Sequence, residues 1–417
     1  MEEVACFRPL HGRANQERRH LRTQVLGLTL FFLVFELVAL EARGAVVEDE
    51  ISVRHEAFSI PDEVAKEKRR AARKSGFSLL KAAGVTWGVD DNIYRSPSGL
   101  EESGNFWGGW AYLRADKRFD EEQRLMTTLS WLQVRYPGNS NANSDRAHIS
   151  TWYTRPLTDN TAVEFDLDID YRNDDATNIR GERYERDYSY WRYTTEGLFI
   201  WNMSREHRFE IGGGYRFKNY DETPGDNSLD WTEPFFKVLY RYRFGSSHYL
   251  GLVYSLKKRE YEEEPASLRD GTEPSSNPKE KHRYQRAGVW YSVPLSEKVD
   301  LGLKYYYRTK EDLFKNYESY NSHRIEAGID LEVSEKMDIS MNAGYTIRNY
   351  DNILGDNGHK LEYTKWDLRV GARYKLRDSC WIFGNLSYYD RQTNKSFGNL
   401  YRDYKGLVCS TGLGFFF

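Results

Sequence analysis

The chain has 417 residues, with 60 lysines and arginines against 63 acidic residues and a formal net charge of −3. This near balance excludes the strongly basic surface that a nucleic-acid-binding protein needs. The mean hydropathy of −0.77 is typical of a soluble protein, yet aromatic residues make up 15% of the chain, with 31 tyrosines and 11 tryptophans. Tyrosine and tryptophan are enriched where proteins meet the membrane–water interface, so a membrane protein also fits.

Residues 1–44 have the order of a secretory signal peptide. The mostly apolar run VLGLTLFFLVFELVAL, at residues 25–40, follows three arginines and precedes several small residues. Cleavage after Ala42 or after Gly44 fits this pattern, and a single uncleaved membrane anchor is the alternative. Residues 45–76 then form a charged periplasmic lead-in, which we interpret as a solvated linker.

Residues 77–417 predict one all-β domain in which tight turns alternate with longer polar loops. We expect about 16 strands, with 14 and 18 as the alternatives, because the first two strands are the least regular. The expected strands lie at residues 79–94, 106–118, 123–136, 146–157, 161–172, 187–202, 207–220, 231–244, 248–261, 282–294, 298–311, 321–334, 337–350, 363–376, 380–391 and 404–417.

Within these strands apolar and polar residues alternate, which is the period of a sheet with two unlike faces. In TAVEFDLDIDYR, at residues 161–172, the apolar residues alternate with acidic ones. The strands exceed the roughly 5–6 residues of globular sheets and suit a tilted bilayer crossing. Trp201, Trp231 and Trp381 lie near strand ends, as in interfacial aromatic girdles. Mid-strand charge on the polar face requires water beside it. The pattern therefore predicts a transmembrane antiparallel up-and-down β-barrel, whose even strand count places both ends on the periplasmic side.

The polar face supplies the candidate pore-lining residues, which form acidic and basic walls that would orient solutes and set ion preference. The other interpretation is that these charges only hydrate the lumen and pair across strands. The candidates are Glu164, Asp166, Asp168, Asp170, Lys237, Arg241, Arg243, Glu326, Asp330, Arg369 and Arg373.

Two cysteines, Cys380 and Cys409, remain after signal cleavage. Hairpin pairing would place Cys380 near Gly414, which puts the two sulfurs roughly 15 Å apart at the usual rise of a strand. A disulfide needs Cα atoms within about 7 Å. We therefore expect two free thiols, with Cys409 on the lipid face.

The last predicted strand, GLVCSTGLGFFF, resembles the C-terminal signature of bacterial outer-membrane β-barrels, with Phe417 and Phe415 at the positions of the membrane-assembly signal. The first strand, GVTWGVDDNIYRSP, resembles that of porin-like barrels associated with surface-polysaccharide systems and of surface lipoprotein assembly modifiers, through Asp91 and Asn92. The modifiers also carry an N-terminal helical-repeat domain, which we do not expect from this sequence. The resemblance implies the outer membrane of a Gram-negative bacterium, with outer-membrane lipid and the barrel-assembly machinery as partners.

No motif of nucleophilic, metalloprotease or phosphate-binding chemistry is present, so we expect no enzyme and no cofactor. His207, His248 and His282 are scattered, so no metal site is expected either. The favoured hypothesis is a porin-like channel for hydrophilic solutes. A barrel component of a surface-polysaccharide export system is the alternative, and an outer-membrane enzyme is a third interpretation. The expected cargo is a hydrophilic solute or a polysaccharide, not nucleic acid, and homo-oligomerisation stays open.

Overall fold

The structure is a computed structural model, and it describes residues 76–93, 101–119, 123–174, 189–220, 230–245, 247–395 and 403–417. The expected signal peptide and nearly all of the charged lead-in lie outside these residues. Among the described residues, no helix is long and apolar enough to cross a membrane.

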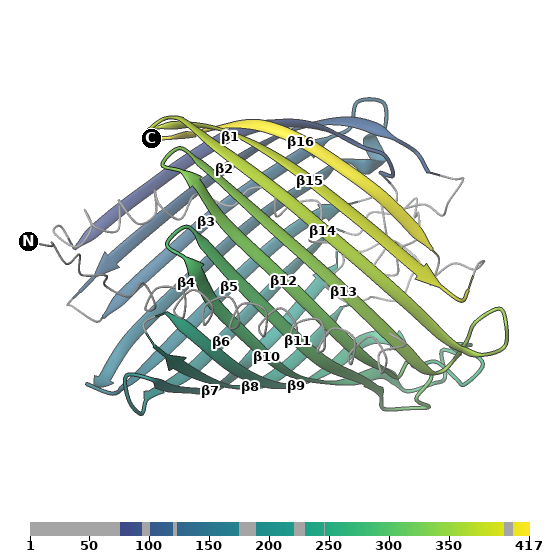
Figure 1. Cartoon of the computed structure of the whole chain (residues 1–417). Coiled ribbons are helices and arrows are strands. Elements are labelled where there is room, and N and C mark those ends of the chain that lie inside the picture. The colour runs from purple at the N-terminus through teal and green to yellow at the C-terminus, as the bar shows by residue number, and fades with distance from the viewer. Residues whose placement is uncertain are drawn as a thin grey trace, which may run out of the picture. The chain divides into compact units, whose positions relative to one another are not determined.

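The described part of the domain contains sixteen strands and one short 3-10 helix (Ser140–Ala142), and the strands follow one another around a closed barrel (Figure 1). They are β1 (Phe77–Asp90), β2 (Gly104–Arg118), β3 (Arg124–Arg135), β4 (Ser144–Thr158), β5 (Thr161–Asp174), β6 (Tyr190–Asn202), β7 (His207–Tyr220), β8 (Trp231–Phe244), β9 (His248–Pro265), β10 (Lys279–Ser296), β11 (Val299–Asp312), β12 (Tyr320–Ser334), β13 (Met337–Leu354), β14 (Lys360–Arg377), β15 (Cys380–Thr393) and β16 (Tyr404–Phe416).

The barrel closes through an antiparallel pairing of β1 with β16, which we call the seam. Its register runs from Ala82 opposite Phe416 to Asp90 opposite Val408. Beyond it, the Phe417 N–H donates to the Lys81 carbonyl at 3.1 Å. Closure leaves no sheet edge, so every strand has a hydrogen-bonding neighbour on both sides. The predicted up-and-down barrel is confirmed, and of the strand counts considered, 16 is the correct one.

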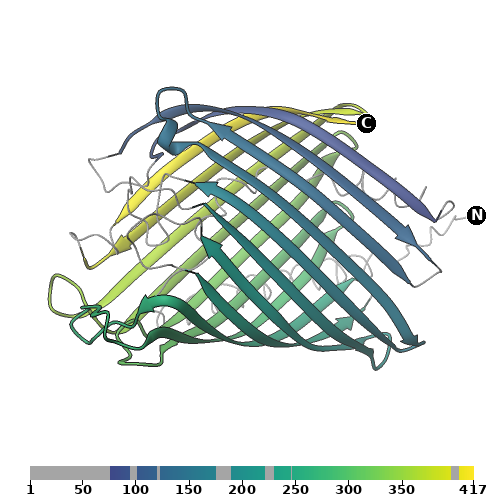
Figure 2. The same ribbon diagram turned by 180° about the vertical axis from the view of Figure 1, so that it is seen from behind.

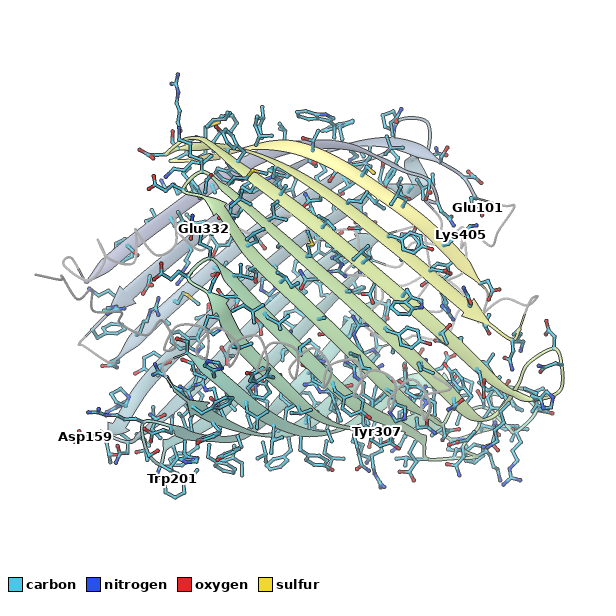
Figure 3. All side chains as sticks on the ribbon, viewed as in Figure 1. Glu101, Asp159, Trp201, Tyr307, Glu332 and Lys405 are labelled. Carbon is cyan, nitrogen blue, oxygen red and sulfur yellow. The ribbon has the colours of Figure 1, made fainter. Side chains whose placement is uncertain are left out.

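The two rims of the barrel differ as the sequence predicts. Short turns join β2 to β3, β4 to β5 and each later pair of that kind, whereas longer connections lie at the opposite rim. Asp159, Trp201 and Glu332 mark the short-turn rim, and Glu101 and Lys405 mark the long-loop rim (Figure 3). All strands tilt in the same sense, and the view from behind shows the tilt continuing around the far wall (Figure 2).

The outer face carries the exposed apolar side chains. Phe165 is 54% exposed and Leu252 is 49% exposed, and their alternating neighbours along each strand point inward. A soluble protein rarely exposes so continuous an apolar surface. Lipid is the solvent that this face suits.

Two of the three tryptophans expected in an interfacial girdle lie instead on the inner face. Trp201 points outward as expected, but Trp231 and Trp381 are buried inside the barrel. Trp231 stacks on the Arg259 guanidinium, 4.1 Å from its ring centroid. Trp381 covers Gly414, where a β-carbon would overlap the indole ring. The expectation that Trp231 and Trp381 face the lipid interface was wrong, because the inner face of the barrel also offers aromatic and apolar neighbours.

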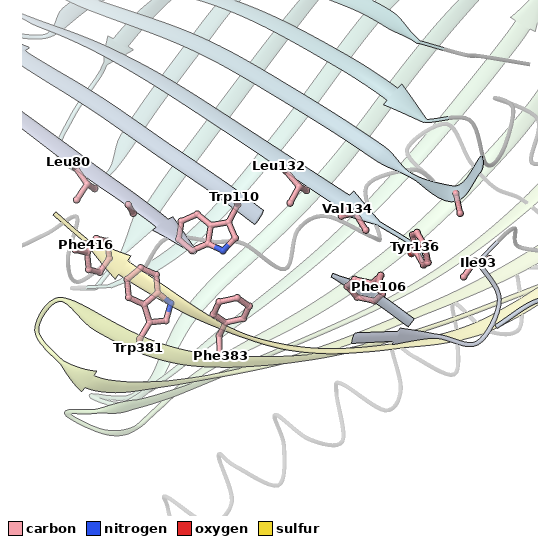
Figure 4. Close-up of a cluster of buried hydrophobic side chains, with 12 residues drawn as sticks. Leu80, Ile93, Phe106, Trp110, Leu132, Val134, Tyr136, Trp381, Phe383 and Phe416 are labelled. Carbon is pink, nitrogen blue, oxygen red and sulfur yellow. The ribbon is translucent and has the colours of Figure 1, made fainter. Parts of the chain in front are cut away.

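Trp381 is buried because it belongs to an apolar cluster on the inner face near the seam, which we call the seam cluster (Figure 4). Its rings pack closely: the centroids of Trp381 and Phe416 are 4.3 Å apart. Phe416 therefore points inward, unlike its neighbours Phe415 and Phe417. The members are Leu80, Ala82, Ile93, Phe106, Trp110, Leu132, Val134, Tyr136, Ala142, Trp381, Phe383 and Phe416.

Cys380 and Cys409 are both free thiols, as predicted, and Cys409 is exposed on the outer face. Cys380 pairs with Phe415, one residue from the expected Gly414, and Cys409 pairs with Leu386. Six positions along β15 therefore separate the two thiols.

Candidate functional site

The eleven candidate pore-lining residues all lie on the inner face, on β5, β8, β12 and β14. Their alternating neighbours Phe165, Phe236, Ile329 and Leu368 are exposed on the outer face, and successive side chains of a strand point to opposite faces. The strand order then decides which of them face one another.

The acidic residues of β5 face basic residues across the lumen. Strands β5 and β13 are eight places apart in a closed ring of 16, so they lie on opposite sides, and β14 is next to β13. Asp168 is the eighth residue of β5 from the short-turn rim, and Arg369 is the ninth residue of β14 from that rim. The two side chains therefore project from opposite walls at similar heights. Such an arrangement creates an electric field across the lumen.

The acidic wall of β5 is partly neutralised by its neighbours. Asp170 Oδ1 lies 2.8 Å from His148 Nδ1 on β4, and Asp170 Oδ2 accepts from the Arg192 guanidinium on β6 at 2.8 Å. His148 Nε2 is 3.7 Å from Asp168 Oδ1. Charges that pair across strands, as the other interpretation of the lining residues expects, are thus present at the end of this wall that is nearer the long-loop rim.

No hydrogen bond joins Ser150 to His148 among the described residues, although the two residues share a strand face. The contacts of the His148 ring go instead to Asp168 and Asp170. The geometry therefore holds the imidazole between two carboxylates.

Cations outnumber acids on the wall formed by β7 to β9. Glu233 of β8 is fully buried, and its carboxylate receives Arg216 at 3.2 Å, Arg259 at 2.9 Å and Lys257 at 3.4 Å. One charge of the three is neutralised, so this part of the lumen is positive. Lys237, further toward the middle of β8, pairs with Glu196 of β6.

The wall formed by β12 to β14, which lies opposite β5, has similar ion pairs. Arg324 of β12 bridges Glu326 at 2.5 Å and Asp367 of β14 at 3.2 Å. Arg373 of β14 donates to Asp338 of β13 at 2.6 Å. These pairs fix the charged heads, because each guanidinium donates hydrogen bonds to one or two carboxylates on its own strand or on a nearby strand.

Several inward-facing charges nevertheless keep contact with open space. The Lys304 side chain is 50% exposed, and the Arg241 side chain is 39% exposed. Both lie on the inner face, where exposure is possible only if no described residue fills the lumen beside them. Water is the only environment that accepts such charges at low cost.

Stacks of cations on aromatic rings occupy the inner face toward the long-loop rim, and strand alternation alone does not predict them. Arg259 lies between Trp231 and Tyr284, with centroid distances of 4.1 and 5.0 Å. Arg348 lies 3.8 Å from the Tyr320 ring centroid. The sequence does hold one sign of such a contact, which is an arginine two residues before a tyrosine in a strand. Arg348 and Tyr350 have this spacing and share a strand face, and the Arg348 guanidinium donates to the Tyr350 hydroxyl.

Comparison with known proteins gives a family match. Residues 201–374 match the family model described as "Outer membrane protein beta-barrel domain". No curated protein sequence matches the chain. The matched segment extends from the end of β6 into β14, within the closed barrel.

Several solved structures are similar to the chain. OmpT of Vibrio cholerae is 10% identical, with a TM-score of 0.47 over 82% of this chain and 98% of that one. An anion-selective porin from Comamonas acidovorans is 9% identical, with a TM-score of 0.45 over 82% and 99%. OccAB1 of Acinetobacter baumannii is 8% identical, with a TM-score of 0.45 over 82% and 96%. Similarity at this level carries no functional argument.

The outer face, the closed ring of strands and the family match lead to one conclusion. Apolar side chains surround the barrel on its outside, and charged side chains line its inside. The family model matches the strands from the end of β6 into β14. The protein is an outer-membrane β-barrel of a Gram-negative bacterium.

Proposed function

We propose that the barrel is a porin-like channel for hydrophilic solutes and that it has no enzymatic activity of its own. The observation that carries the proposal is the half-exposed Lys304 side chain on the inner face. A barrel of 16 strands is wide enough for an aqueous channel. Opposed acidic and basic walls would orient a polar solute as it crosses.

The alternative is a conduit for a surface polysaccharide. Sugars stack on exposed aromatic faces, but Tyr320, Tyr350 and Tyr363 are buried within the cation stacks. These rings therefore give the alternative no support. The two functions differ in a measurable way, since a general channel passes small sugars and a dedicated conduit does not.

Liposome swelling tests the proposal. Vesicles that contain the purified protein should swell in isosmotic solutions of small neutral sugars, and the rate should fall as the sugar grows. Heat-dependent migration in detergent gels verifies that the reconstituted barrel is folded. Folded barrels that admit no small sugar would contradict the proposal and favour the polysaccharide conduit.

A further inference from the structure

A compact group of one histidine and two carboxylates lies apart from the mid-barrel walls, near the long-loop rim. Glu280 and His282 are on the inner face of β10, and Glu318 is in the connection 313–319 between β11 and β12. One ligand atom from each residue lies within 4.8 Å of the other two. In the sequence, Glu318 is 36 residues beyond His282, so spacing gives no sign of the group.

The imidazole of His282 is directed into this group. The residue is 1% exposed. Its Nδ1 lies 3.4 Å from the Tyr284 hydroxyl, and the Tyr261 and Tyr284 rings pack edge-on against the imidazole at 5.8 and 5.9 Å. These contacts fix the ring, and Nε2 points toward the two carboxylates.

His282 Nε2 is buried and makes no hydrogen bond among the described residues. It lies 2.8 Å from Glu280 Oε1 and 3.7 Å from Glu318 Oε2 without hydrogen-bond geometry to either. A buried polar atom normally has a partner, and an exception needs a physical explanation. A cation held between the nitrogen and the carboxylates would supply that partner.

The distances suit a small divalent ion. Metal–ligand bonds of about 2.0–2.2 Å in a tetrahedral site place neighbouring ligand atoms roughly 3.3–3.6 Å apart. The observed separations of 2.8 and 3.7 Å lie on either side of this range. Imidazole nitrogen and carboxylate oxygen are both zinc ligands, and three protein ligands with water in the fourth position match the ligand count of an open zinc site. Calcium and magnesium prefer oxygen ligands alone.

Lys310 explains how the group is stable without an ion. Its ammonium contacts Glu318 Oε2 at 2.5 Å, which neutralises one of the two carboxylates. Oε2 is also the Glu318 oxygen that lies 3.7 Å from His282 Nε2. A metal bound to Oε2 would therefore displace the ammonium toward the other oxygen of the same carboxylate, where a hydrogen-bond donor is commonly kept.

We propose that Glu280, His282 and Glu318 form a binding site for a divalent transition-metal ion of the zinc type. Two ligands belong to β10 and the third to the connection 313–319, so the ion ties this connection to the barrel wall. The site does not depend on the lumen conducting solutes. It would make the order of the long-loop rim depend on metal.

Zinc titration of the chelator-treated, folded protein in detergent tests the site. We expect wild type to bind one zinc ion. The variants His282→Gln and Glu318→Gln should each bind zinc at least about 10-fold more weakly, because loss of even a hydrogen bond to a metal ligand lowers metal affinity 10–100-fold. The control is His148→Gln: His148 also lies 2.8 and 3.7 Å from two carboxylate oxygens, but it is partly exposed and Arg192 holds Asp170. This variant should bind zinc like wild type.

Proteolysis gives a second readout. Lys315 is exposed in the connection 313–319, and zinc should slow tryptic cleavage after it in wild type and in His148→Gln. The protection should be absent in Glu318→Gln, which alters only the connection. The proposal is overturned if wild type binds no zinc, or if folded His282→Gln and Glu318→Gln bind it as tightly as wild type does.

Discussion

At the scale of single residues, the Asp91–Asn92 pair holds the seam together at the long-loop rim. Asp91 exchanges two hydrogen bonds with Leu407 of β16: its N–H donates to the Leu407 carbonyl, and its carboxylate accepts from the Leu407 N–H. Asn92 is fully buried, and its side-chain amide donates to the Lys405 carbonyl at 2.8 Å. The Tyr389 hydroxyl donates to the Asn92 carbonyl. The motif by which the first strand resembles other barrels is thus a structural one.

We predict that Asn92→Ala destabilises the seam. The Lys405 carbonyl would lose its donor in a part-buried contact, and the loss should cost about 1 kcal/mol, as for a typical hydrogen bond. Equilibrium unfolding in urea, followed by tryptophan fluorescence, measures the change. Glu335→Ala, in an exposed short turn, is the control and should unfold like wild type; equal stability of both variants would refute the role of Asn92.

Gly414 shows the second residue-scale device, in which a glycine makes room for an aromatic ring on the neighbouring strand. A β-carbon at this position would overlap the Trp381 indole. We predict that Gly414→Ala costs about 1–3 kcal/mol, as overpacking usually does. The double variant with Trp381→Ala should lose less stability than the two single changes add up to.

Gly302→Ala is the matched control for this change. Gly302 is also an inward-facing strand glycine, but a β-carbon added there would meet no atom within 4 Å. Its substitution should leave the urea midpoint nearly unchanged. If Gly302→Ala and Gly414→Ala are equally destabilising, strand propensity and not ring packing explains the loss.

At the scale of strands, alternation predicted the barrel well and its inner face incompletely. The expected bounds of β7 and β8, 207–220 and 231–244, match the structure, because turn residues delimit them clearly. Strands β9, β10, β13 and β14 are longer than expected, since their hairpins continue past the apolar band. The first strand ends at Asp90, not at 94, because Asp91 and Asn92 turn to hold β16.

The seam cluster could not be found by alternation because its strands are apolar on both faces. Leu79 faces outward and Leu80 inward in β1. A two-residue period cannot separate lipid-facing from cluster residues in such a stretch. Contacts between strands far apart in the sequence, such as Trp110 with Trp381 at 5.9 Å, identify the cluster.

The last strand supports a prediction about assembly. Phe415 of β16 and Phe417 at the chain end are exposed on the outer face, at the positions that resemble the assembly signal of outer-membrane barrels. We predict that Phe417→Ala lowers the amount of folded protein in the outer membrane, measured by heat-dependent migration of membrane fractions. Phe199→Ala, which removes an outward phenylalanine from β6, is the control. Normal levels of the Phe417 variant would contradict a signalling role.

At the scale of the whole molecule, closure of the ring arranges the charges. Residues of β5 and β14 are about 200 positions apart in the chain, and only the strand order places them across the lumen from each other. The sequence predicted which residues face inward. It could not predict which of them would pair, because Arg324 with Asp367 joins strands that are not adjacent.

Single-channel recording in planar bilayers tests the central claim most directly. Wild type should give stable, ion-conducting openings. In the double variant Asp166→Asn, Asp168→Asn the reversal potential under a salt gradient should shift toward anion preference, and in Arg369→Gln toward cation preference, because each change removes one side of the transverse field. Folded barrels that insert but conduct no ions would contradict the claim that the lumen is a solute path.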